Sequence, residues 1–128
     1  MRFLLDTHAL LWSFSDDENL SPTALRAVRD YANDIFVSAA SAWEIGTKFR
    51  IGKLPQAAPF VYTLEESLRK MRFKELAVTI GHGQRAGLLA GEHKDPFDRI
   101  LIAQAQAENL LLVSNEKLFD GYGVQRLW

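Results

Sequence analysis

The feature that most constrains the fold is the alternation of short apolar runs with longer segments whose apolar residues recur at helical spacing. Runs that are apolar throughout are typical of strands buried on both faces of a sheet. Strands separated by single helices favour a parallel sheet with helices on both faces. We therefore expect an α/β fold, a three-layer α/β/α sandwich around a parallel sheet of four to five strands. The expected strands are Arg2–Leu5, Ile35–Val37, Leu76–Val78, Leu110–Val113 and, as a fifth, Val124–Trp128.

The helices between these runs have recognisable starts and ends. Ser21-Pro22 places a capping serine before a proline at the first helical position. No repeat, low-complexity segment or linker interrupts the alternation, so residues 1–128 are expected to form a single domain. The expected helices run from Ser21 to about Tyr31–Ala32, from Ser38 to about Phe49, from Phe60 to about Lys70, from Thr79 to Ala90 and from Pro96 to Glu108.

Composition excludes several classes of protein. The chain has 128 residues, 48% of them hydrophobic, and a net charge of −1, so nucleic-acid binding would need a local basic patch. Because there is no cysteine, disulfides and thiolate-held metal clusters are excluded, which fits a reducing cytoplasm. Asp6 interrupts the first apolar stretch too early for a signal peptide. No stretch of about 18 apolar residues offers a membrane span, so we expect a cytoplasmic protein.

Acidic residues recur where the apolar runs end or where the following helices begin. Asp6 follows the first run, Glu44 lies shortly after the second, Asp95 and Asp98 open the helix before the fourth, and Glu116 follows the fourth. The carboxyl ends of parallel strands meet at one edge of a sheet, where open α/β folds place their sites. Clustered carboxylates repel one another unless a cation lies between them, and hard oxygen ligands suit Mg²⁺ or Mn²⁺. The pattern points to metal-dependent chemistry on a phosphate ester.

Two of these residues also have possible local roles. Asp6 could cap the helix-like segment His8–Phe14. Glu44 fits a capping box that starts at Ser41, and it lies four residues before Lys48, the spacing of a helical ion pair.

The other acidic residues have similar alternatives. Asp95 before Pro96 is a good N-cap and could pair with Arg99, whereas Asp98 in the first helical turn is less fully explained by capping. Glu116 follows Ser114, which could cap a helix there. His8, His82 and His93 lack the short spacing of a zinc site, so each is expected to be a surface or loop residue.

Four stretches, in order, resemble the PIN-domain family and within it the VapC-like toxins of bacterial toxin–antitoxin pairs. The likeness covers nearly the whole chain, and the Asp-Pro-Phe-Asp-Arg segment is its most specific part. The stretches are Phe3-Leu4-Leu5-Asp6-Thr7-His8-Ala9-Leu10-Leu11-Trp12, Val37-Ser38-Ala39-Ala40-Ser41-Ala42-Trp43-Glu44-Ile45 with Lys48, His93-Lys94-Asp95-Pro96-Phe97-Asp98-Arg99-Ile100-Leu101-Ile102-Ala103-Gln104-Ala105, and Leu112-Val113-Ser114-Asn115-Glu116 with Phe119.

The resemblance implies a magnesium-dependent ribonuclease of a type II toxin–antitoxin system. Asp6, Glu44 and Asp98 match the three acidic residues of the family's metal site. Glu116 stands where the family usually has Asp, so it is expected to be a weaker ligand. Supporting roles fall to Thr7, Ser38, Asp95 and Ser114.

The same resemblance implies the chemistry and the partners. Mg²⁺ (or Mn²⁺) would polarise the phosphoryl oxygen and activate a water for in-line attack on RNA. A VapB-like antitoxin would lie in a groove near Trp12–Phe14 and Ile45–Ile51, and the chain would form a homodimer.

Basic residues suggest two surfaces for RNA. Lys48, Arg50 and Lys53 follow Glu44 closely, and we expect them to contact the substrate backbone. A second group has two interpretations, phosphate contact or a solvated helix end whose cations favour the helix dipole. Its members are Arg69, Lys70, Arg72 and Lys74.

Two other functions compete with this one. A phosphotransfer or phosphatase domain also carries Asp after its first strand, but His8 stands where the phosphatase motif needs a second Asp, and Asp6-Thr7 lacks a receiver's acidic pair. A PIN-like binding module without catalysis would explain Glu116 as the loss of a ligand.

Overall fold

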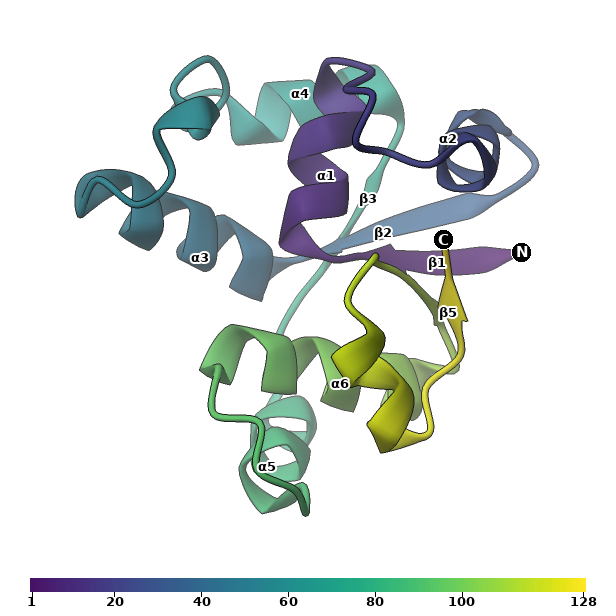
Figure 1. The fold of residues 1–128 in the computed structure, drawn as a ribbon, viewed down its shortest axis with the longest axis vertical. Helices are drawn as coiled ribbons and strands as arrows, with labels where there is room; N and C mark the ends of the chain where they lie inside the picture. Colours follow the sequence, from purple (N-terminus) through teal and green to yellow (C-terminus); the bar gives the residue numbers. More distant parts are fainter.

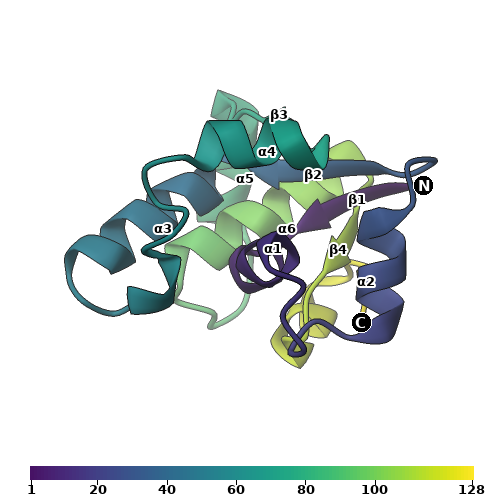
Figure 2. The ribbon, with the colours of Figure 1, turned by 90° about the horizontal axis from the view of Figure 1, so that it is seen from above.

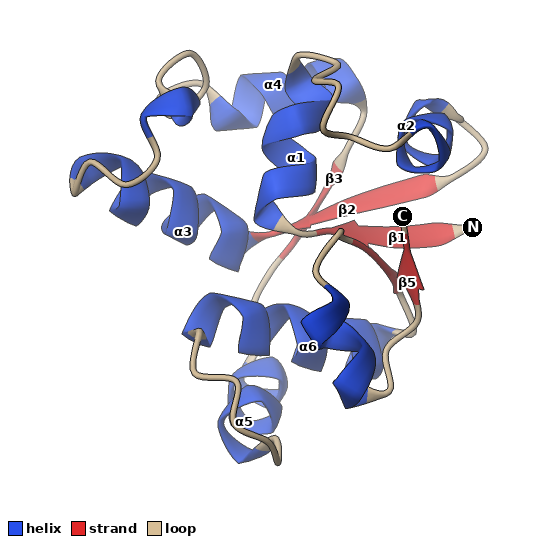
Figure 3. Cartoon of the chain, viewed as in Figure 1, coloured by secondary structure: helices blue, strands red, loops and turns tan.

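The computed structural model describes residues 1–128 and contains one five-stranded parallel sheet (Figure 3). Its strand order is β3-β2-β1-β4-β5, so the N-terminal strand lies at the centre. Phe3 pairs with Ile35 on one side and Leu111 on the other. The strands are β1 (Arg2–Leu5), β2 (Asp34–Ser38), β3 (Lys74–Leu76), β4 (Leu111–Val113) and β5 (Arg126–Leu127).

Helices cover both faces of the sheet, which confirms the predicted three-layer α/β/α sandwich. In Figures 1 and 2, α1 (Thr7–Phe14), α2 (Pro22–Arg29) and α4 (Leu64–Met71) lie on one side, and α5 (Ile80–Leu88) and α6 (Pro96–Glu108) lie on the other. The longer α3 (Ala39–Arg50) extends outward from the end of β2. Two 3₁₀ helices, η1 (Pro55–Ala57) and η2 (Lys117–Tyr122), complete the chain. No helix has the length and apolar character that crossing a membrane would require.

The central strand β1 contributes side chains to two separate cores, because successive strand residues point to opposite faces of a sheet. Phe3 and Leu5 belong to the core beneath α1, α2 and α4. Leu4 belongs to the core beneath α6, together with Leu101 and Leu112. Leu4 and Leu5 have no exposed surface, and burying such a side chain contributes about 1.5–3 kcal/mol. This double burial keeps the strand that leads into Asp6 in place.

Some element bounds differ from the predicted ones. The third strand is Lys74–Leu76 and not Leu76–Val78, because Lys74 pairs with Phe36 of β2, and Ala77 and Val78 lie exposed after the strand ends. It is an edge strand with a charged, largely exposed sequence, so apolarity does not reveal it.

Three helices are shorter than predicted. Helix α5 ends at Leu88 and not at Ala90. Helix α4 begins at Leu64 and not at Phe60, although Phe60 and Val61 pack against the same core from a turn. Helix α2 ends at Arg29, where the amide of Asp30 bonds to the carbonyl of Arg26.

Candidate functional site

Asp6 lies at the point where β1 turns into α1. Its Oδ1 accepts a hydrogen bond from the amide of Ala9 at 2.8 Å, so it caps α1 as one of the two predicted roles required. A capping carboxylate is usually exposed, but Asp6 is only 5% exposed. Burial raises its pKa above the ordinary value, partly opposed by hydrogen bonds from Ser114 and Ala9, and the charge of Glu116 adds to the increase. Burial thus disfavours the ionised form of Asp6.

Glu44 does not take part in the capping box predicted at Ser41. Helix α3 begins earlier, with Ser38 as its N-cap and the Ser38 hydroxyl accepting from the amide of Ala40 at 3.0 Å. This shift moves Glu44 into the body of the helix, where it is 5% exposed and turned inward.

Two side chains hold the Glu44 carboxylate. The hydroxyl of Thr7, from α1, donates to Oε1 at 2.5 Å and lies 3.2 Å from the hydroxyl of Ser41. Lys48 pairs with Oε2, as the spacing of four residues predicts. Thr7 thus joins the end of β1 to α3.

Asp95 and Asp98 open α6 in different ways. Asp95 is the N-cap, and its Oδ1 accepts from the amides of Phe97 and Asp98 at 2.9 and 3.2 Å. The carboxylate of Asp98 is bonded at Oδ2 to Nε2 of His93, 2.9 Å away. Burial and the charges of Asp95 and Glu44 together raise the pKa of Asp98 to about 6, against the opposing hydrogen bond from His93. The half-buried Asp98 therefore lies in a surplus of negative charge.

A clamped loop brings His93 to Asp98, and sequence reasoning missed it. Arg99 does not pair with Asp95; its guanidinium donates to the carbonyls of Ala86, Leu89 and His93 at 2.9, 2.6 and 3.0 Å. The tyrosine hydroxyl of Tyr122 accepts from the amide of His93 at 3.1 Å.

Gly91 makes this approach possible. Its φ is +110°, and a Cβ there would lie 2.7 Å from the Tyr122 hydroxyl oxygen. The only sequence signal for this arrangement was a histidine in a glycine-containing loop just before the Asp-Pro segment.

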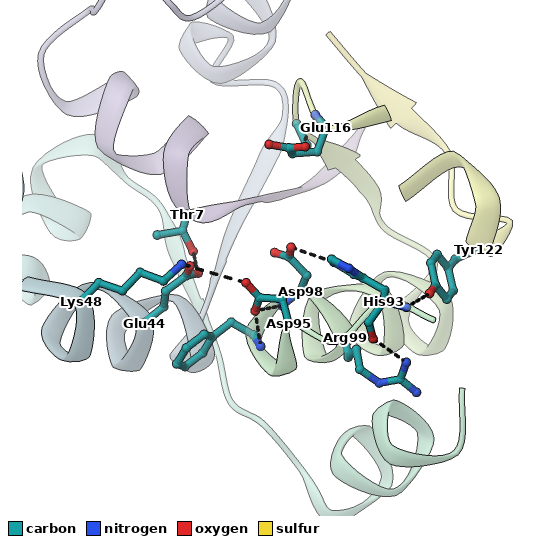
Figure 4. Close-up of polar contacts among 11 residues, drawn as sticks. Thr7, Glu44, Lys48, His93, Asp95, Asp98, Arg99, Glu116 and Tyr122 are labelled. Atoms are coloured by element: carbon teal, nitrogen blue, oxygen red, sulfur yellow. Dashed lines mark hydrogen bonds and ion pairs between the residues drawn. The ribbon is translucent and has the colours of Figure 1, made fainter. Parts of the chain in front are cut away.

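The two predicted site residues after β4, Ser114 and Glu116, differ in their burial. Ser114 is fully buried, and its hydroxyl accepts from the amide of Glu116 at 2.9 Å. The Glu116 side chain is exposed and makes no capping bond to η2. Figure 4 shows it separated from the group formed by Glu44, Asp95 and Asp98.

The acidic side chains thus form two groups, with Glu116 acting on Asp6 and with Glu44 and Asp95 acting on Asp98. As the side chains stand, no three of the acidic and histidine residues are close enough together to hold one metal ion. The ammonium of Lys48 lies within the group around Asp98, where it pairs with Glu44 and is 4.0 Å from Asp95 (Figure 4). Burial would lower the pKa of Lys48, but the hydrogen bond and charge of Glu44 outweigh it and raise the pKa.

These observations bear on whether a divalent cation fits. The donors are carboxylate oxygens, which suit Mg²⁺ or Mn²⁺, and a positive charge would relieve the repulsion of Asp98 by Asp95 and Glu44. The ammonium of Lys48 already meets part of that demand. The donor set fits a hard cation.

The predicted basic surfaces differ in outcome. Lys48 contacts Glu44 and not solvent alone, whereas Arg50 and Lys53 are exposed beyond it. Lys74 pairs with Asp34 and Arg72 lies over Tyr31, at the strand ends opposite the acidic residues. The second basic group is therefore a solvated helix end and not a part of this site.

One histidine prediction was wrong. His82 is buried; its Nδ1 accepts from the amide of Thr79, and its Nε2 is bonded to Glu108 at 2.8 Å. It ties α5 to α6 and is not a surface residue. His93 is also partly buried, against Phe119 and Tyr122.

Comparison with known families decides the membership of the chain. The sequence model of the family described as PIN domain matches residues 3–124. This chain belongs to the PIN domain family.

Individual PIN proteins are similar to different extents. Ribonuclease VapC16 from Mycobacterium tuberculosis (strain ATCC 25618 / H37Rv) is 40% identical over 55 residues, which are 43% of this chain and 39% of that protein. The match thus spans well under two thirds of that relative's length.

Two solved structures share the fold over almost their whole length. DNA-bound VapBC from Salmonella typhimurium superposes with a TM-score of 0.68 at 14% identity, covering 99% of this chain and 97% of that one. The sarcin-ricin loop cleaving toxin VapC20 from Mycobacterium tuberculosis superposes with a TM-score of 0.64 at 15% identity, covering 95% of both chains. At such identities these likenesses show a common PIN fold.

Proposed function

We propose that this PIN domain is a Mg²⁺-dependent endoribonuclease, with Mn²⁺ as an alternative ion. The observation that carries the proposal is the surplus of negative charge at the carboxyl edge of the sheet. It raises the pKa of Asp98 to about 6, through burial and the charges of Asp95 and Glu44. Such a group of carboxylates, drawn from far-apart segments, suits a divalent cation that in turn binds a phosphodiester.

The ligand roles follow the positions of the acidic residues. Asp6, Glu44 and Asp98 would hold the ion, and Glu116 would contribute from the rim. When bound, Mg²⁺ supplies charge stabilisation at the phosphoryl oxygen and a more acidic water.

The surrounding residues keep these ligands in place. Thr7 donates to Glu44, His93 is bonded to Asp98, and Asp95 caps the helix that carries Asp98. Ser114 donates toward Asp6, and Ser38 caps α3. Once an ion neutralises Glu44, Lys48 is free to turn toward the RNA backbone, with Arg50 and Lys53 beyond it.

We further propose that the chain is the toxin of a toxin–antitoxin pair in the cytoplasm and forms a homodimer. VapC16 is named a ribonuclease, and the Salmonella neighbour is a VapBC complex. A cavity of about 410 Å³ between α1, α3, α4 and the end of β3 offers a mostly apolar groove for an antitoxin segment. Its apolar lining includes Leu10, Val37, Ala42, Leu64, Leu68 and Leu76.

The sequence placed the antitoxin groove elsewhere, near Trp12–Phe14 and Ile45–Ile51. Trp12 and Phe14 are half-buried and Ile45 is buried, whereas Ile51 is exposed.

The test is cleavage of RNA by the pure chain. Wild type and Asp6→Asn are incubated with total RNA in Mg²⁺, Mn²⁺ or chelator, and the new 5′ ends are mapped. Cleavage by wild type alone, abolished by chelator, supports the proposal. Cleavage that survives both changes would contradict it. Co-expression with the neighbouring gene and mass measurement by light scattering test the antitoxin and the dimer.

A PIN-like binding module without catalysis is the second candidate. It is favoured by the exposed Glu116 and by the pairing of Glu44 with Lys48. Calorimetric titration of Mn²⁺ into wild type and Asp6→Asn distinguishes the two functions. A nuclease should bind Mn²⁺ and lose this binding in Asp6→Asn, whereas a binding module should show no Mn²⁺ binding that depends on Asp6.

A further inference from the structure

One aromatic side chain beside the acidic residues has no structural partner that explains its exposure. Trp43 lies on α3 next to Glu44 and is 64% exposed. Exposing a large aromatic ring is unfavourable for folding, so a structural role does not account for it. The other conspicuously exposed aromatics, Tyr31 and Tyr62, do not adjoin the acidic residues.

Trp43 is joined to the acidic group by a short chain of contacts. Its ring meets the ring of Phe97 edge to face, with centroids 4.8 Å apart and planes at 75°. The centroid of the Phe97 ring also lies 5.9 Å from Nζ of Lys48, which pairs with Glu44. Phe97 also precedes Asp98 at the start of α6. The aromatic pair therefore borders the place where a phosphodiester would be held.

We propose that Trp43 is a platform on which an unpaired base of single-stranded RNA stacks, with Phe97 supporting the ring from its edge. The inference rests on the proposed ribonuclease function. A phosphate held at the acidic group would lie near the Trp43–Phe97 pair, and the exposed ring of Trp43 would be accessible to a base of the same strand. Stacking on aromatic rings is a common means by which proteins bind unpaired bases, and it tolerates different sequences because every base has a π face.

The physical features of the surroundings favour a nucleotide over a protein partner. A stacked base needs one flat ring and a charged group near its phosphate, and Trp43 with Lys48 supplies both. A protein interface would require a wider apolar surface, but the residues one turn from Trp43 on α3 are the small or polar Ala39, Gly46 and Thr47.

The test measures binding with and without bases. The probe is a fluorescent octanucleotide of adenosine, and its control is an abasic ribose-phosphate chain of the same length. Binding is measured by anisotropy with Asp6 intact and with Ca²⁺ in place of Mg²⁺, because Ca²⁺ is also a hard cation that binds carboxylate oxygens but is a poor catalyst of hydrolysis. Trp43→Ala should weaken binding of the adenosine probe about 5- to 150-fold, the range measured for base–aromatic stacking. It should leave binding of the abasic probe unchanged, and Trp43→Phe should restore much of the loss.

The matched control is Tyr31→Ala, which removes an even more exposed aromatic ring, near the strand ends opposite the acidic residues, and should change neither probe's binding. Equal weakening for both probes, or none, would overturn the stacking proposal. A change of mass in light scattering without base dependence would also overturn it and assign Trp43 to a protein contact.

Cleavage by proteins with Asp6 intact separates the two proposals. If wild type cleaves RNA and Trp43→Ala shows no base dependence, only the stacking proposal fails. If wild type cleaves nothing but Trp43 binds bases, only the nuclease proposal fails.

Discussion

Replacing Asp98 by Asn should stabilise the metal-free protein at neutral pH. The pKa of Asp98 is raised from 3.8 to about 6 by burial and by the charges of Asp95 and Glu44. Because this pKa is raised in the folded protein, the contribution of Asp98 to the free energy of unfolding is intact below about pH 4 and is lost as the pH rises through about 6. Asn never ionises, so the variant avoids this loss.

The magnitude follows from the difference of about two pKa units, which corresponds to roughly 2–3 kcal/mol of unfolding free energy at pH 8. Because the Asp98 side chain is 25% exposed, solvent screening places the result toward the lower end. The bond to His93 survives, since the Asn carbonyl can accept from Nε2.

Urea unfolding of both proteins, in chelator and at each pH from 4 to 8, measures the effect. The stability of Asp98→Asn minus that of wild type should be near zero at pH 4 and should grow as the pH rises. Adding Mg²⁺ should remove the difference by stabilising wild type alone. Parallel stability curves, or a variant that is less stable at pH 8, would refute the electrostatic reasoning.

Asp34→Asn is the control of opposite sign. The hydrogen bond and charge of Lys74 lower the pKa of Asp34, so its contribution is present above its ordinary pKa and is lost as the pH falls. This variant should be slightly less stable than wild type near neutrality and equal to it in acid.

Three further predictions concern the site. Asp6→Asn should abolish RNA cleavage while retaining the native circular dichroism spectrum, because it removes a ligand charge and no core volume; cleavage at the wild-type rate would exclude Asp6 as a ligand. Glu116→Asp should keep or raise activity at low Mg²⁺, whereas Glu116→Ala should increase the Mg²⁺ requirement; identical activity curves for the three proteins would show that Glu116 does not act on the ion. Arg99→Lys should lower the free energy of unfolding by roughly 1.5–3 kcal/mol and speed hydrogen exchange at the amide of His93, because Lys cannot bond three carbonyls at once; unchanged exchange would show that the clamp does not order the loop.

Sequence reasoning recovered the parts of the structure that depend on local pattern. The runs around Leu4 and Leu112 are buried on both faces, so their unbroken apolarity predicted β1 and β4 nearly to the residue. Strand β5 was also predicted. The edge strand β3 was displaced because Lys74 and Glu75 carry no apolar signal.

The reasoning failed where long-range contacts decide the outcome. Glu44 was an even choice between cap and ligand, and the contact from Thr7, which is distant in the chain, turns it inward. The clamp of Arg99 was missed because its partners are backbone carbonyls, whose positions depend on a loop and not on residue type. The exposure of Trp43 was likewise invisible, since a helical tryptophan is usually part of the core.

The brevity of the two outer strands also limits how copies of this chain can associate. Strand β3 has three residues and carries Lys74 and Glu75, and β5 has only two. A sheet continued across two molecules would therefore gain very few backbone hydrogen bonds. Pairing of edge strands between molecules, which can lead to aggregation, is therefore disfavoured at both β3 and β5. Association of this chain with a partner is therefore expected through surfaces other than the edges of its sheet.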